Sequence, residues 1–188
     1  ATLPALAIAA PLAYVPNEGS GTISVIDTST DKVIANIPAG EKPRGLAVGN
    51  DSHWAYVSDK PHGTLQLIDL RTGKMDGAIK LGASPEGVEI SPDGRWVVAA
   101  IEENNEIAIA DANTNTLAFK VKVKGKNPEH AVFSPDGRSI YVSAENGNDI
   151  DVIDFATRKQ VAQVQVGARP RGIGFLPDGS FAYVASEN

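Results

Sequence analysis

Four charged side chains recur along this chain at one spacing, each directly after a proline. Guanidinium groups bind carboxylate or phosphate through two parallel hydrogen bonds, so arginines brought together would favour an anionic ligand. If these residues meet in a ring, two arginines and two glutamates can bind a small polar or anionic ligand. The alternative is that they pair with one another and with solvent. The four residues are Arg44, Glu86, Glu129 and Arg171.

A histidine stands beside one of these residues, where the other three copies have glycine. His130 follows Glu129, whereas Gly45, Gly87 and Gly172 occupy the same place elsewhere. An imidazole there can be a metal ligand, a haem ligand or a proton-transfer group, or an ordinary packing residue. One histidine does not make a metal site. Because we find no His-x-x-x-His and no His-plus-carboxylate spacing, we predict no metal site.

Other catalytic and metal-binding patterns are absent from the sequence. There is no Gly-x-Ser-x-Gly motif and no phosphate-binding loop, so we name no catalytic residue and favour a protein that is not an enzyme. Several acidic residues lie in the predicted connections between neighbouring strands, where asparagines add oxygen donors, and clustered oxygens can bind calcium. They lack the Asp-x-Asp-x-Asp-Gly ladder, so we expect solvated loops. These residues are Glu18, Asp59, Glu102, Glu103, Glu106, Glu145 and Asp149.

The elements that must position these residues follow from an internal repeat. Tyr-Val pairs begin at Tyr14, Tyr56, Tyr141 and Tyr183, and Val98 occupies the remaining place, so that successive copies lie 42 or 43 residues apart. Each period holds four short runs of alternating side chains, separated by turns rich in Gly, Pro, Asn and Asp. A four-stranded repeat of roughly 40–45 residues is typical of a propeller blade. The sequence therefore predicts an all-β propeller with antiparallel blades.

The repeat also predicts how many blades are present and where the charged residues lie. We expect three strands in 13–38, three further blades whose innermost strands lie near 45–49, 87–91 and 130–134, and two strands in 171–186. About four blades' worth is present, which we interpret as a fragment of a seven-bladed ring; a four-bladed ring or a ring of two chains is the alternative. The charged residues then lie at the channel mouth. The repeat units are 13–54, 55–96, 97–139 and 140–181, with the next starting at 182.

Composition and the N-terminal residues limit the partners and the compartment. The net charge is −6 and the basic residues are scattered, so we expect no nucleic-acid partner. There is no cysteine. Residues 1–13 are uncharged but too short to span a bilayer. We interpret 1–12 as the remnant of a signal peptide, with Ala7-Ile8-Ala9 as its cleavage site, and predict a periplasmic or secreted protein. An N-terminal strand is the alternative.

Some segments carry a family resemblance. The runs Tyr14–Asn17, Gly21–Thr28, Asp31–Ile34 and Ile37–Gly40 resemble the YVTN propeller repeat. Within that family the chain is most similar to exported propellers associated with PQQ-dependent (quinoprotein) alcohol catabolism. It is similar, more distantly, to the propeller of haem-d-type nitrite reductase and to archaeal surface-layer propellers.

The resemblance implies three functions. The first is a non-catalytic exported propeller without a cofactor, which binds a protein partner or small ligand on its channel face and serves quinoprotein-linked oxidation. The second is a redox propeller that carries haem or quinone, with His130 as a ligand. The third is a structural module of the cell surface.

Overall fold

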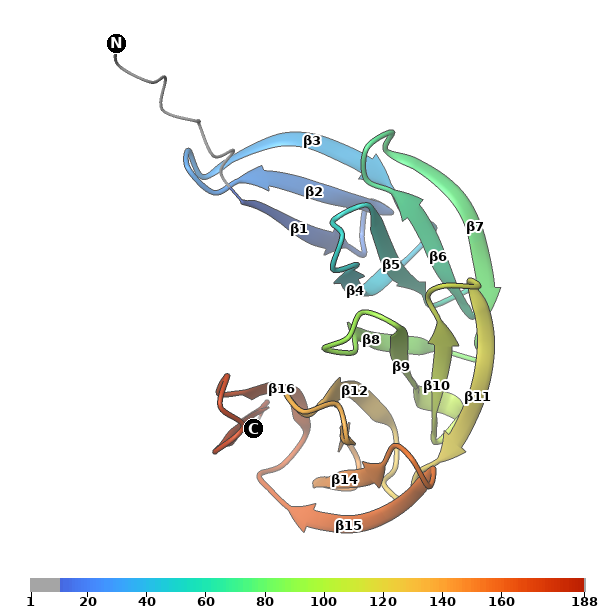
Figure 1. Ribbon diagram of the computed structural model, residues 1–188, viewed down its shortest axis with the longest axis vertical. Coiled ribbons are helices and arrows are strands. Elements are labelled where there is room, and N and C mark those ends of the chain that lie inside the picture. The colour runs from blue at the N-terminus through green and yellow to red at the C-terminus, as the bar shows by residue number, and fades with distance from the viewer. Residues whose placement is uncertain (1–10, 188) are drawn as a thin grey trace.

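The computed structural model describes residues 11–187, which form antiparallel β-sheets arranged as the blades of an open arc (Figure 1). Three complete blades have four strands each. Blade 2 contains β4 (Pro43–Val48), β5 (Trp54–Asp59), β6 (Thr64–Asp69) and β7 (Lys74–Lys80). Blade 3 contains β8 (Pro85–Ile90), β9 (Trp96–Ile101), β10 (Glu106–Asp111) and β11 (Thr116–Lys122). Blade 4 contains β12 (Pro128–Phe133), β13 (Ser139–Ala144), β14 (Asp149–Asp154) and β15 (Lys159–Gln165).

The sheets at the two ends have fewer strands. Blade 1 contains β1 (Leu12–Asn17), β2 (Thr22–Asp27) and β3 (Lys32–Pro38), and blade 5 contains β16 (Pro170–Phe175) and β17 (Ala182–Ser186). Within residues 11–187 no strand of blade 1 pairs with a strand of blade 5. The all-β propeller is confirmed, and the described chain is an open arc, so the alternative of a four-bladed ring closed by its own terminal strands is wrong. The seven-bladed ring stays a prediction.

The turns between the first two strands of a blade follow from the Pro-Asp-Gly segments. Gly94, Gly137 and Gly179 all have a positive φ near +70° (73°, 69° and 72°), a conformation that side chains rarely adopt. The aspartate before each glycine accepts a hydrogen bond from a backbone N–H two residues on, as Asp93 does from Arg95 at 3.0 Å. These turns therefore hold the short connections of the sheet and are structural.

In blades 1 to 4 an aspartate, preceded by Ile or Ala, ends the strand that lies next to the outermost strand. Asp27 and Asp69 each accept a backbone hydrogen bond of 2.8 Å in the following turn, and the equivalent aspartates do the same. Just before this turn the pairing between that strand and the outermost strand shifts register in blades 1 to 4. A repeated bulge increases strand twist, which lets each outer strand wrap around its blade.

The core lies between the blades. Four clusters of buried side chains are present, one at each boundary from blade 1 to blade 5. At the boundary of blades 2 and 3, for example, Leu65 and Leu67 pack with Val97 and Ile101. Neighbouring blades cover both faces of blades 2, 3 and 4, so side chains that point to either face of these sheets are apolar.

The repeated tyrosines differ more than the sequence indicates. Tyr56 is 2 % exposed and belongs to the core between blades 2 and 3. Tyr14 and Tyr141 are partly buried, and each packs against the cluster at another blade boundary. Tyr183 is 64 % exposed, because no further blade covers β17 in the described chain.

Helical structure is limited to one short turn in the described residues, the 3₁₀ helix η1 (Glu102–Asn104) between β9 and β10. Across residues 11–187 we find no helix with the length and apolar character needed to cross a membrane. The signal-peptide interpretation and the Ala7-Ile8-Ala9 site lie outside the described residues. Strand β1 begins at Leu12, one residue inside the predicted extension.

Candidate functional site

The four charged residues occupy the same position in four successive innermost strands. Each is the second residue of its strand: Arg44 in β4, Glu86 in β8, Glu129 in β12 and Arg171 in β16. These strands line the inner edge of the arc, side by side (Figure 1). The structure therefore brings the predicted residues into one row at the channel mouth, and a shallow cavity of about 330 Å³ lies beside Arg44, Glu86 and Glu129.

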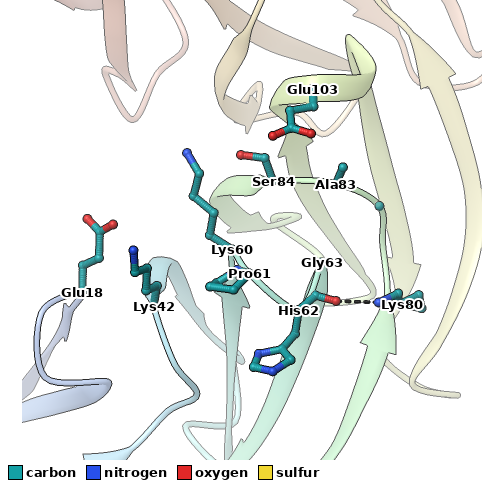
Figure 2. Close-up of a pocket in the computed structure, with 11 residues that line it drawn as sticks. Glu18, Lys42, Lys60, Pro61, His62, Gly63, Lys80, Ala83, Ser84 and Glu103 are labelled. Carbon is teal, nitrogen blue, oxygen red and sulfur yellow. Dashed lines mark hydrogen bonds between the residues drawn. The ribbon is translucent and has the colours of Figure 1, made fainter.

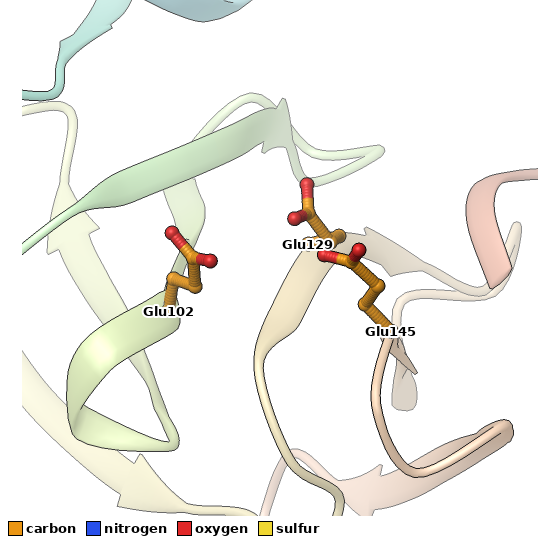
Figure 3. Close-up of side chains that lie close together, drawn as sticks. All are labelled: Glu102, Glu129 and Glu145. Carbon is orange, nitrogen blue, oxygen red and sulfur yellow. The ribbon is translucent and has the colours of Figure 1, made fainter. Parts of the chain in front are cut away.

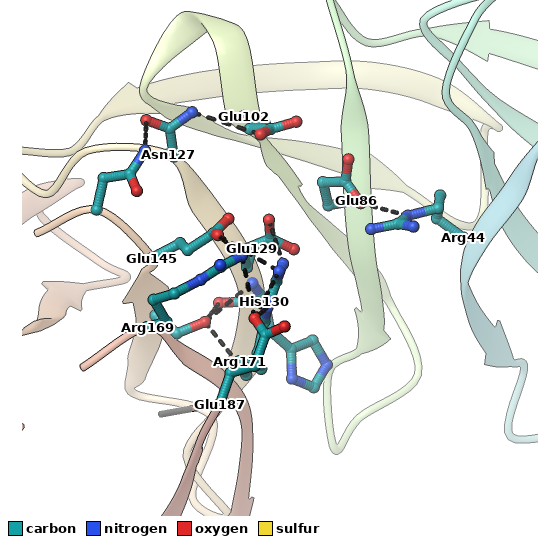
Figure 4. Close-up of polar contacts among 12 residues, drawn as sticks. Arg44, Glu86, Glu102, Asn127, Glu129, His130, Glu145, Arg169, Arg171 and Glu187 are labelled. Atoms are coloured by element: carbon teal, nitrogen blue, oxygen red, sulfur yellow. Dashed lines mark hydrogen bonds and ion pairs between the residues drawn. The ribbon is translucent and has the colours of Figure 1, made fainter. Parts of the chain in front are cut away.

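The first half of this row is a network of ion pairs across blades 1 to 3, and Figure 4 shows its pair between Arg44 and Glu86. Arg44 Nε donates to Glu86 Oε2 at 2.7 Å, and Arg44 Nη1 donates to Glu18 Oε2 at 2.7 Å. Glu86 is 2 % exposed, and its other oxygen accepts from Lys60 Nζ at 2.7 Å. Lys60 also contacts Glu102 at 3.0 Å. A nearly buried carboxylate thus has two cationic partners, which a buried charge needs.

The second half is a similar network across blades 4 and 5. Arg171 Nη1 lies 2.5 Å from Glu129 Oε1, and Arg171 Nη2 contacts Glu145 at 3.3 Å and Glu187 at 3.0 Å. Arg169 pairs with Glu145 and Glu187 as well. The arginines and glutamates of the row thus pair with one another, which is the alternative considered from the sequence. Arg44 and Arg171 nevertheless keep about a third of their side chains exposed, at 31% and 33%.

Negative charge is concentrated where the two networks meet. Glu102, Glu129 and Glu145 each offer an oxygen within 4.8 Å of the others (Figure 3). Burial raises the pKa of Glu129 to about 7, and its contact with Glu145 and repulsion from Glu86 act in the same direction, against the attraction of Arg171. The contact with Glu129 lowers the pKa of Glu145, so the proton that the pair shares resides on Glu129. This pair is a group that changes charge near neutral pH.

His130 lies at the seam between three innermost strands. A Cβ atom on Gly87 would overlap with Cδ2 of the His130 ring, so the glycine of the neighbouring blade makes room for the imidazole. On the other side the backbone N–H of Ile173 donates to Nδ1 at 3.3 Å. Burial lowers the pKa of His130 and keeps the ring neutral. Since Nδ1 accepts this bond, the neutral ring carries its proton on Nε2.

Two serines that the sequence analysis did not single out position the row. Ser58 Oγ accepts from Gly45 N at 2.8 Å and donates to Glu86 O at 2.6 Å, so it ties β4 to β8. Ser143 Oγ accepts from His130 N at 3.1 Å and donates to Arg171 O at 2.6 Å. Their signal was the repeated Tyr-Val-Ser at Tyr56 and Tyr141.

A contact between a histidine and a carboxylate corrects the statement that the sequence has no His-plus-carboxylate spacing. His62 Nδ1 lies 2.8 Å from Oδ2 of Asp59, so a His-plus-carboxylate pair is present at a spacing of three residues. Asp59 is fully buried; desolvation acts to raise its pKa, but hydrogen bonds from Lys42 N, His62 and Glu41 N outweigh it and lower the pKa. His62 lines a cavity of about 820 Å³ with Lys42, Lys60 and Lys80 (Figure 2). Lys60, which lines this cavity, also pairs with Glu86 of the row, so the cavity lies beside the row.

Comparison with known proteins gives a family and a fold. No match is found among curated proteins. Among solved structures, a chain of Kuenenia stuttgartiensis Hydrazine Synthase is similar over 92% of this chain, with a TM-score of 0.85 and 23% sequence identity. The present chain spans about half of that chain, 51% of its length, and the likeness shows the fold alone.

A family model matches this chain and agrees with one of the two more distant resemblances, that to the propeller of haem-d-type nitrite reductase. The YVTN subfamily and the quinoprotein association stay predictions. The model of the Cytochrome D1 heme domain matches residues 10–130, which is more than half of the 188 residues. The chain therefore belongs to the cytochrome D1 heme domain family.

Proposed function

We propose that this chain forms part of a haem-binding redox propeller, the second of the functions considered from the sequence. The observation that carries the proposal is the His130 ring, which is largely buried and neutral at the channel mouth of a chain in the cytochrome D1 heme domain family. A neutral imidazole beside a channel is suited to contact a haem or the ligand bound to it. Export to the periplasm or the outside is part of this proposal.

Two arginines of the channel mouth fit such a group. Haem carries carboxylate side chains, and the exposed faces of Arg44 and Arg171 would hold carboxylates by charge-assisted hydrogen bonds. The haem would supply electron transfer and a site for a small ligand. Both arginines already pair with glutamates, so a bound carboxylate would share them with Glu86 and Glu129.

The hydrogen bond to Nδ1 favours one role of His130 over another. An iron ligand that uses Nε2 must carry its proton on Nδ1, and Nδ1 here accepts a hydrogen bond from Ile173 N. In this arrangement Nε2–H is the remaining donor of the ring. We therefore assign His130 as a hydrogen-bond donor or proton-transfer group toward the channel ligand, and axial ligation is the outcome that the experiment below distinguishes.

The test is to titrate the purified chain with haem and follow visible absorption. We expect stoichiometric binding, weakened about tenfold or more when Arg44 and Arg171 are both replaced by Gln. His130→Gly should leave the spin state of the iron unchanged and weaken binding of azide, a small anionic probe. His53→Gln, at a distant turn, serves as the control. Absence of stoichiometric haem binding contradicts the proposal, and a spin-state change in His130→Gly assigns His130 to the iron instead.

A further inference from the structure

Glu89 lies in the innermost strand of blade 3 with one carboxyl oxygen unpaired among the described residues. It belongs to β8, two residues after Gly87, whose missing side chain makes room for His130. Its Oε2 atom is buried and has no hydrogen-bond partner among the described residues. A buried polar atom without a partner is costly, so each such atom calls for an explanation.

The repeat shows that this carboxyl group is not needed by the fold. The corresponding residues of the neighbouring innermost strands are Ala47, Val132 and Gly174, at the same spacing of 42 or 43 residues. All three are small or apolar, and they occupy the same position in the same kind of strand. Blade 3 therefore has an ionisable group where other blades of this chain have hydrocarbon or no side chain.

The surroundings of Glu89 are almost entirely apolar. It lines a cavity of about 270 Å³ together with Val132, Phe133, Ile173 and Phe175, and it pairs across the sheet with Val98. The other side chains with polar atoms in this lining are Asn50 and Ser91. Asn50 Nδ2 donates to Pro92 O at 3.2 Å and Ser91 Oγ donates to Asp93 at 2.5 Å, and neither contacts Oε2 of Glu89.

These surroundings decide the protonation of the carboxyl group. Strands β4, β5, β9 and β12 pack against β8, and β16 also reaches the cavity, but none of them places a charged or titratable side chain of the described chain in the cavity lining. Burial raises the pKa of Glu89 to about 7, against the stabilising contact with the backbone N–H of Phe133. A carboxylic acid in an apolar site gains or loses its proton at neutral pH, as ionisation without a partner is unfavourable.

We propose that Glu89 is a proton-holding group built into the channel wall, on the same seam between β8 and β12 that holds the His130 ring. When it dissociates, the O–H bond breaks, the carboxylate keeps the electron pair, and the proton passes to water in the adjoining cavity. The use of this proton rests on the proposed function, because reductions of a channel ligand consume protons. The protonation itself does not depend on haem.

The first test uses the purified chain without haem. Infrared spectra of protein labelled with ¹³C-glutamate should show a protonated carboxyl band that disappears with a midpoint near pH 7. Glu89→Gln should remove part of this band, and Glu129→Gln should remove the part that belongs to the channel mouth. Glu103→Gln, at an exposed residue of η1 outside this cavity, should leave it unchanged. If Glu89→Gln leaves the band unchanged, the proposal is wrong. If Glu89→Gln does not fold, Glu89→Ala, which copies Ala47, replaces it.

The second test measures proton uptake when the haem-loaded chain is reduced in weakly buffered solution at pH 7. Glu89→Gln should change the uptake by up to one proton per haem, and Glu103→Gln should not. A change equal in both variants would overturn the role in proton supply. If the chain binds no haem, the proposed function fails, while the infrared result still decides whether Glu89 holds a proton.

Discussion

The guanidinium of Arg44 donates to the carboxylate of Glu86 at 2.7 Å, and the two residues occupy the same position in adjacent repeats, 42 residues apart. The ion pair therefore joins two innermost strands, β4 and β8, close to where each strand begins. Because Glu86 is 2 % exposed and also binds Lys60, it stays paired when Arg44 is removed.

We expect Arg44→Gln to lower the free energy of unfolding by about 1–2 kcal/mol, since a hydrogen bond to a charged group contributes about 1.5–3 kcal/mol and Lys60 compensates in part. Urea unfolding measures this. Arg138→Gln, an exposed arginine 3.8 Å from Asp136, should change stability by less than about 0.5 kcal/mol. Equal effects of the two substitutions would show that the Arg44–Glu86 pair contributes nothing particular.

The two buried serines give a second prediction. Ser58→Ala and Ser143→Ala should each cost about 1–3 kcal/mol, because each leaves a backbone donor and a backbone acceptor of two innermost strands without their shared partner. Hydrogen exchange should increase at Gly45 N in the first variant and at His130 N in the second. Ser20→Ala, in an exposed turn, is the control. Unchanged exchange at both amides would contradict the bridging role.

The glycines of the channel row offer a matched pair of substitutions. Gly87→Ala places a methyl group against the His130 ring and should destabilise the protein by about 1–3 kcal/mol, as overpacking does. Gly172→Ala, at the same position of the repeat, meets nothing within 4 Å and should be nearly neutral. The NMR signals of His130 should shift in the first variant alone. A shift of equal size in both would mean that Gly87 does not position the ring.

The raised pKa of Glu89 predicts how stability depends on pH. The pKa in the folded protein, about 7, is above the ordinary value of 4.5. The group is therefore neutral and harmless to stability below pH 4.5, and its cost grows as the pH rises to 7. Relative to Glu89→Gln, the wild type should lose on the order of 2 kcal/mol between pH 4.5 and 8. Parallel stability curves of the two proteins over this range would contradict the raised pKa.

The sequence predicted the architecture because each landmark has a local cause that repeats. Prolines begin the innermost strands, and Pro-Asp-Gly makes the turn that follows each of the later ones. The aspartate at the end of the strand next to the outermost one accepts a hydrogen bond that closes the turn after it. Such signals depend on a few neighbouring residues, so one chain suffices to detect them. The register of Arg44 and Glu86 followed from the same count.

The partners within the candidate site could not be predicted in this way. Ser58 donates to the backbone of Glu86, 28 residues further along the chain, and whether a serine is buried against two backbones depends on the distance between blades. Glu89 looks like a polar residue of an alternating strand, and only the packing of Phe133 and Ile173 shows that it lies in an apolar site. Asp59 and His62 are only three residues apart, but whether their side chains meet depends on the turn between them.

The placement of every hydrophobic cluster between blades has a consequence for folding. Each cluster needs side chains from two neighbouring sheets, so an excised sheet has both of its faces bare and no interior of its own. Cohesion then accumulates by nearest neighbours, as in other stacked arrays. Damage at one junction weakens the two sheets that share it and leaves the more remote junctions intact, so the arc should come apart in segments.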